Sequence, residues 1–122
     1  MGIERFEQLD VWSEAHALVL CTYKALLNIP DDEKYALIPQ MRRSAVSVPA
    51  NIAEGFKRIG QKDKVHFYNI AQGSLEELRY YYILSLDLNY RLDYTTLEAK
   101  MDIVSKMLAG LIRSIRATLV KR

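Results

Sequence analysis

The apolar residues of this chain recur at helical spacing through four long segments, and only three short stretches interrupt the pattern. The interruptions, at 28–32, 58–61 and 89–94, contain the turn-forming residues Asn, Pro, Gly and Asp. An apolar side chain at every third or fourth position indicates amphipathic α-helix, and no segment alternates as a β-strand does. We therefore expect four helices, over residues 10–27, 32–58, 62–88 and 95–120.

Four amphipathic helices joined by short connections pack antiparallel to their neighbours. The 122 residues are enough for one such domain and too few for two. The sequence therefore predicts one all-α domain over residues 1–122, an antiparallel up-down-up-down four-helix bundle. Its core is expected to include a coiled-coil-like stripe on the last helix, formed by Leu97, Met101, Val104, Leu108, Leu111, Ile115 and Leu119.

Two sequence features predict where helices begin. Thr95-Thr96-Leu97-Glu98 has the pattern of a capping box, with Thr95 as the N-cap of the last helix. Pro39 and Pro49 both lie in the second helical segment, where each removes an internal hydrogen bond. Because the apolar stripe keeps its phase across both prolines, we expect one long, kinked helix. The alternative is that Pro39 opens the helix and residues 32–37 form a separate turn.

The last helix has a second stripe beside the first. It contains the apolar or small residues Ile103, Met107, Gly110 and Ser114. A single four-helix core does not need both stripes, so we expect the second to be an apolar interface between subunits. The alternative is one broad core face within a single bundle.

The second helix has a polar face opposite its apolar stripe. Arg43, Ser47 and Glu54 project from it, and Asn51 lies at its edge. We interpret these four residues as a polar network or a subunit interface. The alternatives are a solvated face, with Glu54 and Arg58 as an i,i+4 ion pair, or a surface for an anionic partner.

The net charge of +2 conceals strong segregation along the chain. Residues 1–33 carry −5, residues 34–64 carry +5, residues 65–98 carry −3 and residues 99–122 carry +5. Clustered cations favour contact with phosphates, although Lys and Arg also complement helix C-termini. The candidate nucleic-acid-binding residues are Arg42, Lys57, Arg58, Lys62, Arg113, Arg116, Lys121 and Arg122. With no helix-turn-helix pattern, we expect recognition by shape and charge.

Motifs for metal binding and catalysis are not found in the sequence. A di-iron bundle needs two Glu-x-x-His pairs, whereas this chain has a single Asp63-x-x-His66, and its other histidine, His16, follows Ser13. We expect His16 to be a core residue of the first helix. There is also no phosphate-binding glycine loop and no G-x-S-x-G elbow. We expect no metal, no cofactor and no enzymatic activity.

Cellular location is constrained by what the chain lacks. One cysteine excludes an internal disulfide, and the acidic N-terminus does not have the apolar core of a signal peptide. No uncharged run approaches the ~18 apolar residues of a membrane helix. We expect a cytoplasmic protein that does not enter the membrane.

Three stretches together are distinctive: residues 6–12 (FEQLDVW), 40–55 (QMRRSAVSVPANIAEG) and 71–78 (AQGSLEEL). They resemble the bacterial four-helix-bundle proteins encoded in intervening sequences of large-subunit ribosomal RNA genes. These are distantly similar to the accessory variability determinants of diversity-generating retroelements. The resemblance covers nearly the whole chain, and the Asn-Ile-Ala-Glu-Gly stretch at 51–55 is its most specific part.

The resemblance implies an antiparallel four-helix bundle that assembles as a cyclic homopentamer. In the retroelement relatives the ring binds structured RNA and a reverse transcriptase, which are therefore the partners that the resemblance implies. It also implies that Arg43, Asn51 and Glu54 make contacts between helices or subunits. Gly55 and Gly73 are then expected to be close-packing positions.

The resulting functional hypothesis is a non-enzymatic, homo-oligomeric accessory protein that binds structured RNA or an RNA–protein complex through its basic clusters. The alternative is an oligomeric scaffold whose partner is another polypeptide and which has no nucleic-acid ligand.

Overall fold

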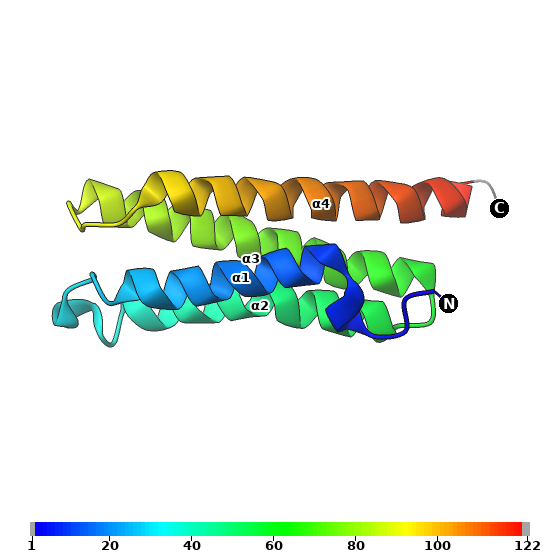
Figure 1. The fold of residues 1–122 in the computed structure, drawn as a ribbon, viewed down its shortest axis with the longest axis horizontal. Helices are drawn as coiled ribbons and strands as arrows, with labels where there is room; N and C mark the ends of the chain where they lie inside the picture. The colour runs from blue at the N-terminus through cyan, green and yellow to red at the C-terminus, as the bar shows by residue number, and fades with distance from the viewer. Residues whose placement is uncertain (1, 121–122) are drawn as a thin grey trace.

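The computed structural model describes residues 2–120, and in this range it contains four α-helices and no strand. The helices are α1 (Asp10–Leu26), α2 (Leu37–Lys57), α3 (Gln61–Asp87) and α4 (Tyr94–Val120), with short 3₁₀ turns η1 (Phe6–Gln8) and η2 (Asp31–Glu33). They extend along one long axis and reverse direction at each connection (Figure 1). The predicted all-α, four-helix architecture is confirmed.

The core lies between the four helices and is formed mainly by the predicted apolar stripes. On α2, Ile38, Met41, Ala45, Val48 and Ile52 are buried. On α4, among the residues whose burial is described, the buried side chains are Leu97, Met101, Val104, Leu108, Ile112 and Ile115. The expected stripe is therefore correct except near the C-terminus of α4, where Ile112 is buried and its neighbour Leu111 is only partly so.

The prediction that the second helix begins at residue 32 is wrong. Residues 31–33 form η2, and α2 begins at Leu37, so Pro39 is the third residue of the helix. The first N–H groups of a helix have no intrahelical acceptor, so proline is tolerated there at little cost. The carboxylate of Glu33 instead accepts a hydrogen bond from the Leu37 amide at 3.4 Å. Pro49, in contrast, is interior, and α2 continues through it.

The start of α4 also differs from the predicted capping box. The helix begins at Tyr94, and Asp93 rather than Thr95 satisfies its first amides. The Asp93 carboxylate accepts from the Thr96 amide at 3.2 Å and from the Thr96 hydroxyl at 2.7 Å. Both hydrogen bonds lower the pKa of Asp93, and the one from the Thr96 hydroxyl has the larger effect.

The buried face of α3 is rotated from the one that the sequence pattern indicates. We expect Phe67, Ile70 and Tyr81 inside, but all three lie at least partly exposed at the edge. Ala71, Leu78 and Ser85 of the expected stripe are buried, and the other buried residues are Val65, Tyr68, Leu75 and Tyr82. Apolar residues surround much of this helix, so helical periodicity alone defines its inward direction poorly.

On α1 the expectation of a core histidine is wrong. His16 is exposed, and its ring stacks on Trp12 with centroids 5.0 Å apart and planes within 7°. The sequence pattern places Trp12, Ala15, Val19, Tyr23 and Leu26 on the inward face, and Ala15, Val19 and Leu26 are indeed buried. Leu18, which lies off this stripe, is also fully buried, whereas Tyr23 is 43% exposed. The inward face of α1 is therefore rotated from the predicted one toward Leu18.

A buried polar contact joins α1 and α3 near their C-terminal ends. The hydroxyls of Thr22 and Tyr82 lie 2.6 Å apart, and both residues are fully buried. Burial raises the pKa of the Tyr82 phenol, so this group stays protonated and neutral. A buried hydroxyl without a partner is costly, so this pair favours one relative placement of the two helices.

Replacing Tyr82 with phenylalanine is expected to lower the free energy of unfolding by about 1–2 kcal/mol, because the Thr22 hydroxyl then loses its partner inside the core. Urea denaturation measures this loss. Adding Thr22→Val removes the orphaned hydroxyl and is expected to recover most of the stability. Equal stability of Tyr82→Phe and the wild type would show that the hydroxyl pair contributes nothing.

The α2–α3 pair approaches closely at Gly55. A Cβ at this position would lie 2.8 Å from Cε1 of Tyr68, closer than real Cβ contacts, and Tyr68 is 2% exposed. Gly55 is therefore a close-packing position, as expected. Gly73 is not, because a Cβ there would meet no atom within 4 Å among the described residues.

Candidate nucleic-acid interface

The fold brings together charges that are far apart in the sequence. The N-terminal segment, the α2–α3 turn and the C-terminal end of α4 lie at one end of the bundle, and the other two connections lie at the opposite end (Figure 1). The opposite end includes the acidic residues Asp31, Asp32, Glu33, Asp87 and Asp93. The two positive blocks of the sequence thus contribute to the same end.

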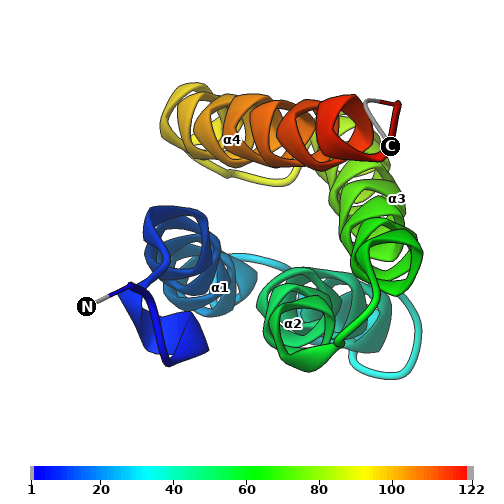
Figure 2. The ribbon, with the colours of Figure 1, turned by 90° about the vertical axis from the view of Figure 1, so that its right-hand side faces the viewer.

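We call Lys57, Arg58, Lys62, Arg113 and Arg116 the basic end; all five are exposed. Figure 2 views this end directly and shows the last turns of α4 next to α3, with the N-terminal segment on the α1 side. The acidic residues Glu4 and Glu7 belong to that segment, away from α4. These exposed cations suit a phosphate backbone, which bears closely spaced negative charges. Two exposed acidic residues, Glu54 and Asp63, belong to the same end of α2 and α3.

The cations of the basic end differ in how firmly they are held. Arg58 lies 3.5 Å from Glu54 and stacks over Phe67, 4.5 Å from the ring centroid. Among residues 2–120, the structure shows no ion pair for Lys57, Lys62, Arg113 or Arg116. Arg58 is therefore partly neutralised and oriented, while the other four remain available to an anionic ligand.

Lys64 has a structural role that the sequence pattern did not indicate. Its ammonium group donates to the carbonyl of Phe56 at 2.6 Å and to that of Gly55 at 3.3 Å. These carbonyls belong to the last turn of α2, where the Gly55 carbonyl also accepts a hydrogen bond from the Arg58 amide at 3.2 Å. Burial lowers the pKa of Lys64. Lys64 therefore closes the end of α2 instead of extending the basic end.

Replacing Lys64 with methionine is expected to cost about 1 kcal/mol of stability, because two terminal carbonyls lose a charged donor that is only partly buried. Thermal and urea unfolding measure the loss. Affinity for an anionic ligand should change little, so a large loss of affinity with unchanged stability would place Lys64 at the interface instead.

One of the expected nucleic-acid-binding residues, Arg42, does not lie with the others. Arg42 is near the opposite end of α2, about 22 Å from Lys57 at 1.5 Å per residue. Its guanidinium lies over the Tyr23 ring, 5.4 Å from the centroid. Lys121 and Arg122 lie outside the residues that the structure describes.

The polar face of α2 separates into distinct contacts. Ser47 bonds Ser74 of α3 at 2.8 Å, and the amide of Asn51 donates to the Ser47 hydroxyl at 2.9 Å. Arg43 instead donates to Gln40, and Glu54 pairs with Arg58. Ser47 and Asn51 are therefore joined in an α2–α3 contact, and Arg43 and Glu54 are not part of it.

The second stripe of α4 lies outside most of the core. Ile103 is 46% exposed and Ser114 is exposed, while Gly110 and Met107 are partly buried. A Cβ at Gly110 would approach only the Arg113 side chain, at 3.8 Å, so packing within residues 2–120 does not require glycine there. This surface is available for contact with another molecule.

Other features of the described residues narrow the chemistry. No group of three or more His, Cys, Asp or Glu side chains in residues 2–120 is arranged to hold a metal ion. In the same range, no helix has the length and apolar character needed to span a bilayer. The basic end consists of exposed cationic side chains, which can attract an anionic ligand.

The fold and the basic end together define a class of protein: a small helical bundle with exposed cations at one end. Residues 7–110 match the family described as 23S rRNA-intervening sequence protein, and the chain belongs to that family. A solved protein of unknown function from the S23 ribosomal protein family of Bacteroides thetaiotaomicron has the same fold. Its TM-score is 0.74 at 23% identity, over 84% of this chain and 97% of that one. No curated protein matches.

Proposed function

We propose that this protein is a non-enzymatic accessory protein that binds structured RNA through its basic end. The observation that carries the proposal is the convergence of two separate positive blocks, from the α2–α3 turn and from α4, on one end of the bundle. The family description, 23S rRNA-intervening sequence protein, supports an RNA context for that surface. Contacts with phosphates would position the RNA without reading its sequence.

We further propose that the functional unit is a homo-oligomer, a cyclic pentamer in the form implied by the sequence resemblance. The partly exposed stripe of Ile103, Met107, Gly110 and Ser114 supports a subunit contact, because further burial of the Ile103 and Met107 side chains is favourable. A closed ring would repeat the basic end once per subunit and strengthen the attraction for an anionic ligand. The proposed location is the cytoplasm, and a reverse transcriptase or another RNA-binding protein is a proposed further partner.

Binding to a structured RNA hairpin across a salt series tests the RNA proposal. We expect affinity that falls steeply and linearly on a log–log plot as salt rises, because each neutralised phosphate releases counterions. Absence of binding at low salt, or binding that is insensitive to salt, would refute it. Copurification of a polypeptide without nucleic acid would favour the scaffold alternative.

Sedimentation equilibrium tests the oligomer independently. The proposal expects a species several times the 14.1 kDa chain, and Ile103→Lys should dissociate it by placing a charge in the contact. A monomer at micromolar concentration would remove this part of the proposal while leaving RNA binding to be judged by the salt series.

A further inference from the structure

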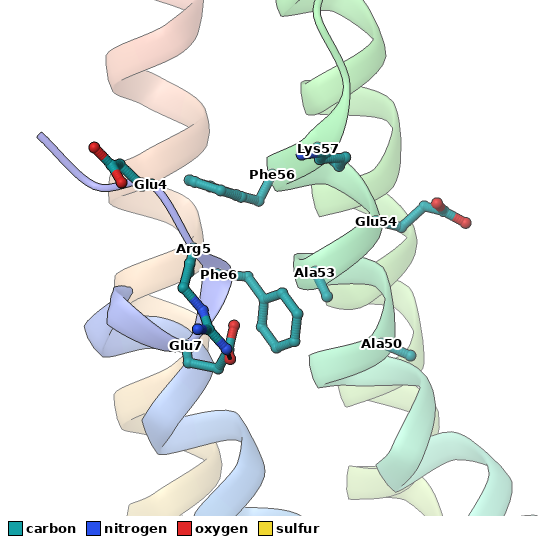
Figure 3. A pocket seen from close by; sticks show the side chains of 9 residues that line it. All are labelled: Glu4, Arg5, Phe6, Glu7, Ala50, Ala53, Glu54, Phe56 and Lys57. Carbon is teal, nitrogen blue, oxygen red and sulfur yellow. Dashed lines mark hydrogen bonds and ion pairs between the residues drawn. The ribbon is translucent and has the colours of Figure 1, made fainter.

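A shallow pocket lies next to the basic end, between the N-terminal segment and the second half of α2. Its volume is about 570 Å³, within the range of small-ligand pockets. Figure 3 shows that the Phe56 ring projects from α2 toward the N-terminal segment, and that the Phe6 ring projects from η1 toward Ala53 and Ala50. We call it the Phe6–Phe56 pocket.

Four of the nine residues that line the Phe6–Phe56 pocket are apolar, and two of these are aromatic. Phe6 and Phe56 are each only partly buried, although Phe6 packs edge-on against Trp12 with centroids 5.1 Å apart. Ala50 and Ala53 present only methyl groups, which leaves room beside the rings. A flat aromatic ligand can therefore gain contact with a phenyl ring here.

The charges around the pocket do not favour an anionic ligand inside it. Arg5 pairs with Glu7, and Glu54 pairs with Arg58, so that only Glu4 and Lys57 of the charged lining residues remain and their charges cancel. A phosphate would therefore meet no excess of positive charge, whereas a neutral flat ring could contact the phenyl rings. A nucleobase has such a flat face.

Lys57 connects the pocket to the basic end, since it belongs to both. An RNA strand whose phosphates lie on the basic end would therefore pass the mouth of the pocket. We propose that the Phe6–Phe56 pocket takes one unpaired base of the bound RNA, stacked on Phe56. This inference rests on the proposed RNA-binding function and adds to it a preference for RNA with an unpaired nucleotide, as single-stranded sites are read by stacking on aromatic side chains.

The test compares a blunt RNA duplex with the same duplex carrying one bulged adenine. The wild type should bind the bulged duplex about tenfold more tightly, the range that stacking on an aromatic ring supplies. Phe56→Leu should abolish this preference without changing the affinity for the blunt duplex or the salt slope. Ala53→Met, which fills the pocket and leaves both rings, should have the same effect. Tyr35→Leu, which removes an aromatic side chain that is 89% exposed at the opposite end, should keep the preference.

The outcomes separate this inference from the proposed function. Salt-dependent RNA binding with no preference for the bulge, or with a preference that both Phe56→Leu and Ala53→Met retain, overturns the pocket and leaves the proposed function standing. Absence of binding to either duplex by the wild type overturns both. Circular dichroism confirms folding, and if Phe56→Leu is unfolded, Ala53→Met decides the result.

Discussion

Replacing Gly55 with valine is expected to lower the free energy of unfolding by about 3 kcal/mol. Even the first added carbon would lie 2.8 Å from Tyr68 Cε1 and 3.1 Å from Phe67 Cβ. Tyr68 is almost fully buried, so its ring has no free space to move into, and α2 and α3 must separate. Overpacking of a close helix contact costs about 1–3 kcal/mol for small additions, and a branched side chain is at the upper end. Urea denaturation measures the loss.

The matched control is Gly73→Val, because Gly73 is also a helical glycine but a Cβ at its position would meet no atom within 4 Å in the described range. Valine is a slightly better helix former than glycine, so stability should change by less than about 0.5 kcal/mol. Equal effects at the two positions would contradict a close α2–α3 contact at Gly55. If Gly73→Val dissociated the oligomer without destabilising the folded subunit, Gly73 would instead lie in a subunit contact.

Reversing the charge of Lys57 and Lys62 together is expected to weaken RNA binding about 100-fold at low salt. Both side chains are exposed at the α2–α3 turn and, within the described residues, neither forms an ion pair. Each lost phosphate contact also reduces the salt slope by about one, so the slope should become shallower by about two. The measurement is the affinity for a structured RNA hairpin across a salt series with Lys57→Glu/Lys62→Glu.

The control reverses Lys24 and Lys34, two exposed lysines near the opposite end. The net charge changes by the same amount, but α3 alone spans about 40 Å between the ends, several Debye lengths at physiological salt. Affinity should therefore change less than about threefold and the slope should be unchanged. Equal losses in both variants would indicate that net charge, and not the basic end, determines binding.

The fold was largely predictable because four long segments with helical periodicity leave few alternatives. The stripe on α2 was largely correct because its apolar residues occupy one side, and the stripe on α4 was correct as far as Leu108. On α3, Tyr and Ile residues occur on several sides, so the periodicity did not distinguish the buried Tyr68 and Tyr82 from the exposed Ile70. The start of α2 depended on tertiary contacts of Glu33, which also accepts a hydrogen bond from Tyr90 at 2.7 Å.

The candidate site was only partly predictable. The charge blocks were visible in the sequence. Which cations meet at one end depends on the direction and length of each helix, and the position of Arg42 near the opposite end was therefore seen only in the structure. The capping role of Lys64 depends on the geometry of the α2–α3 turn. The Phe6–Phe56 pocket joins residues about 50 positions apart, and no local pattern marks such a pair.

Cross-linking of the wild-type protein to a structured RNA hairpin, with mass-spectrometric identification of the modified peptides, tests the central claim most directly. The account predicts cross-links on residues 56–64 and 113–116, which form or adjoin the basic end, and few on residues 31–35 and 87–93 at the opposite end. Cross-links concentrated at the opposite end, or spread evenly over all four helices, would contradict it.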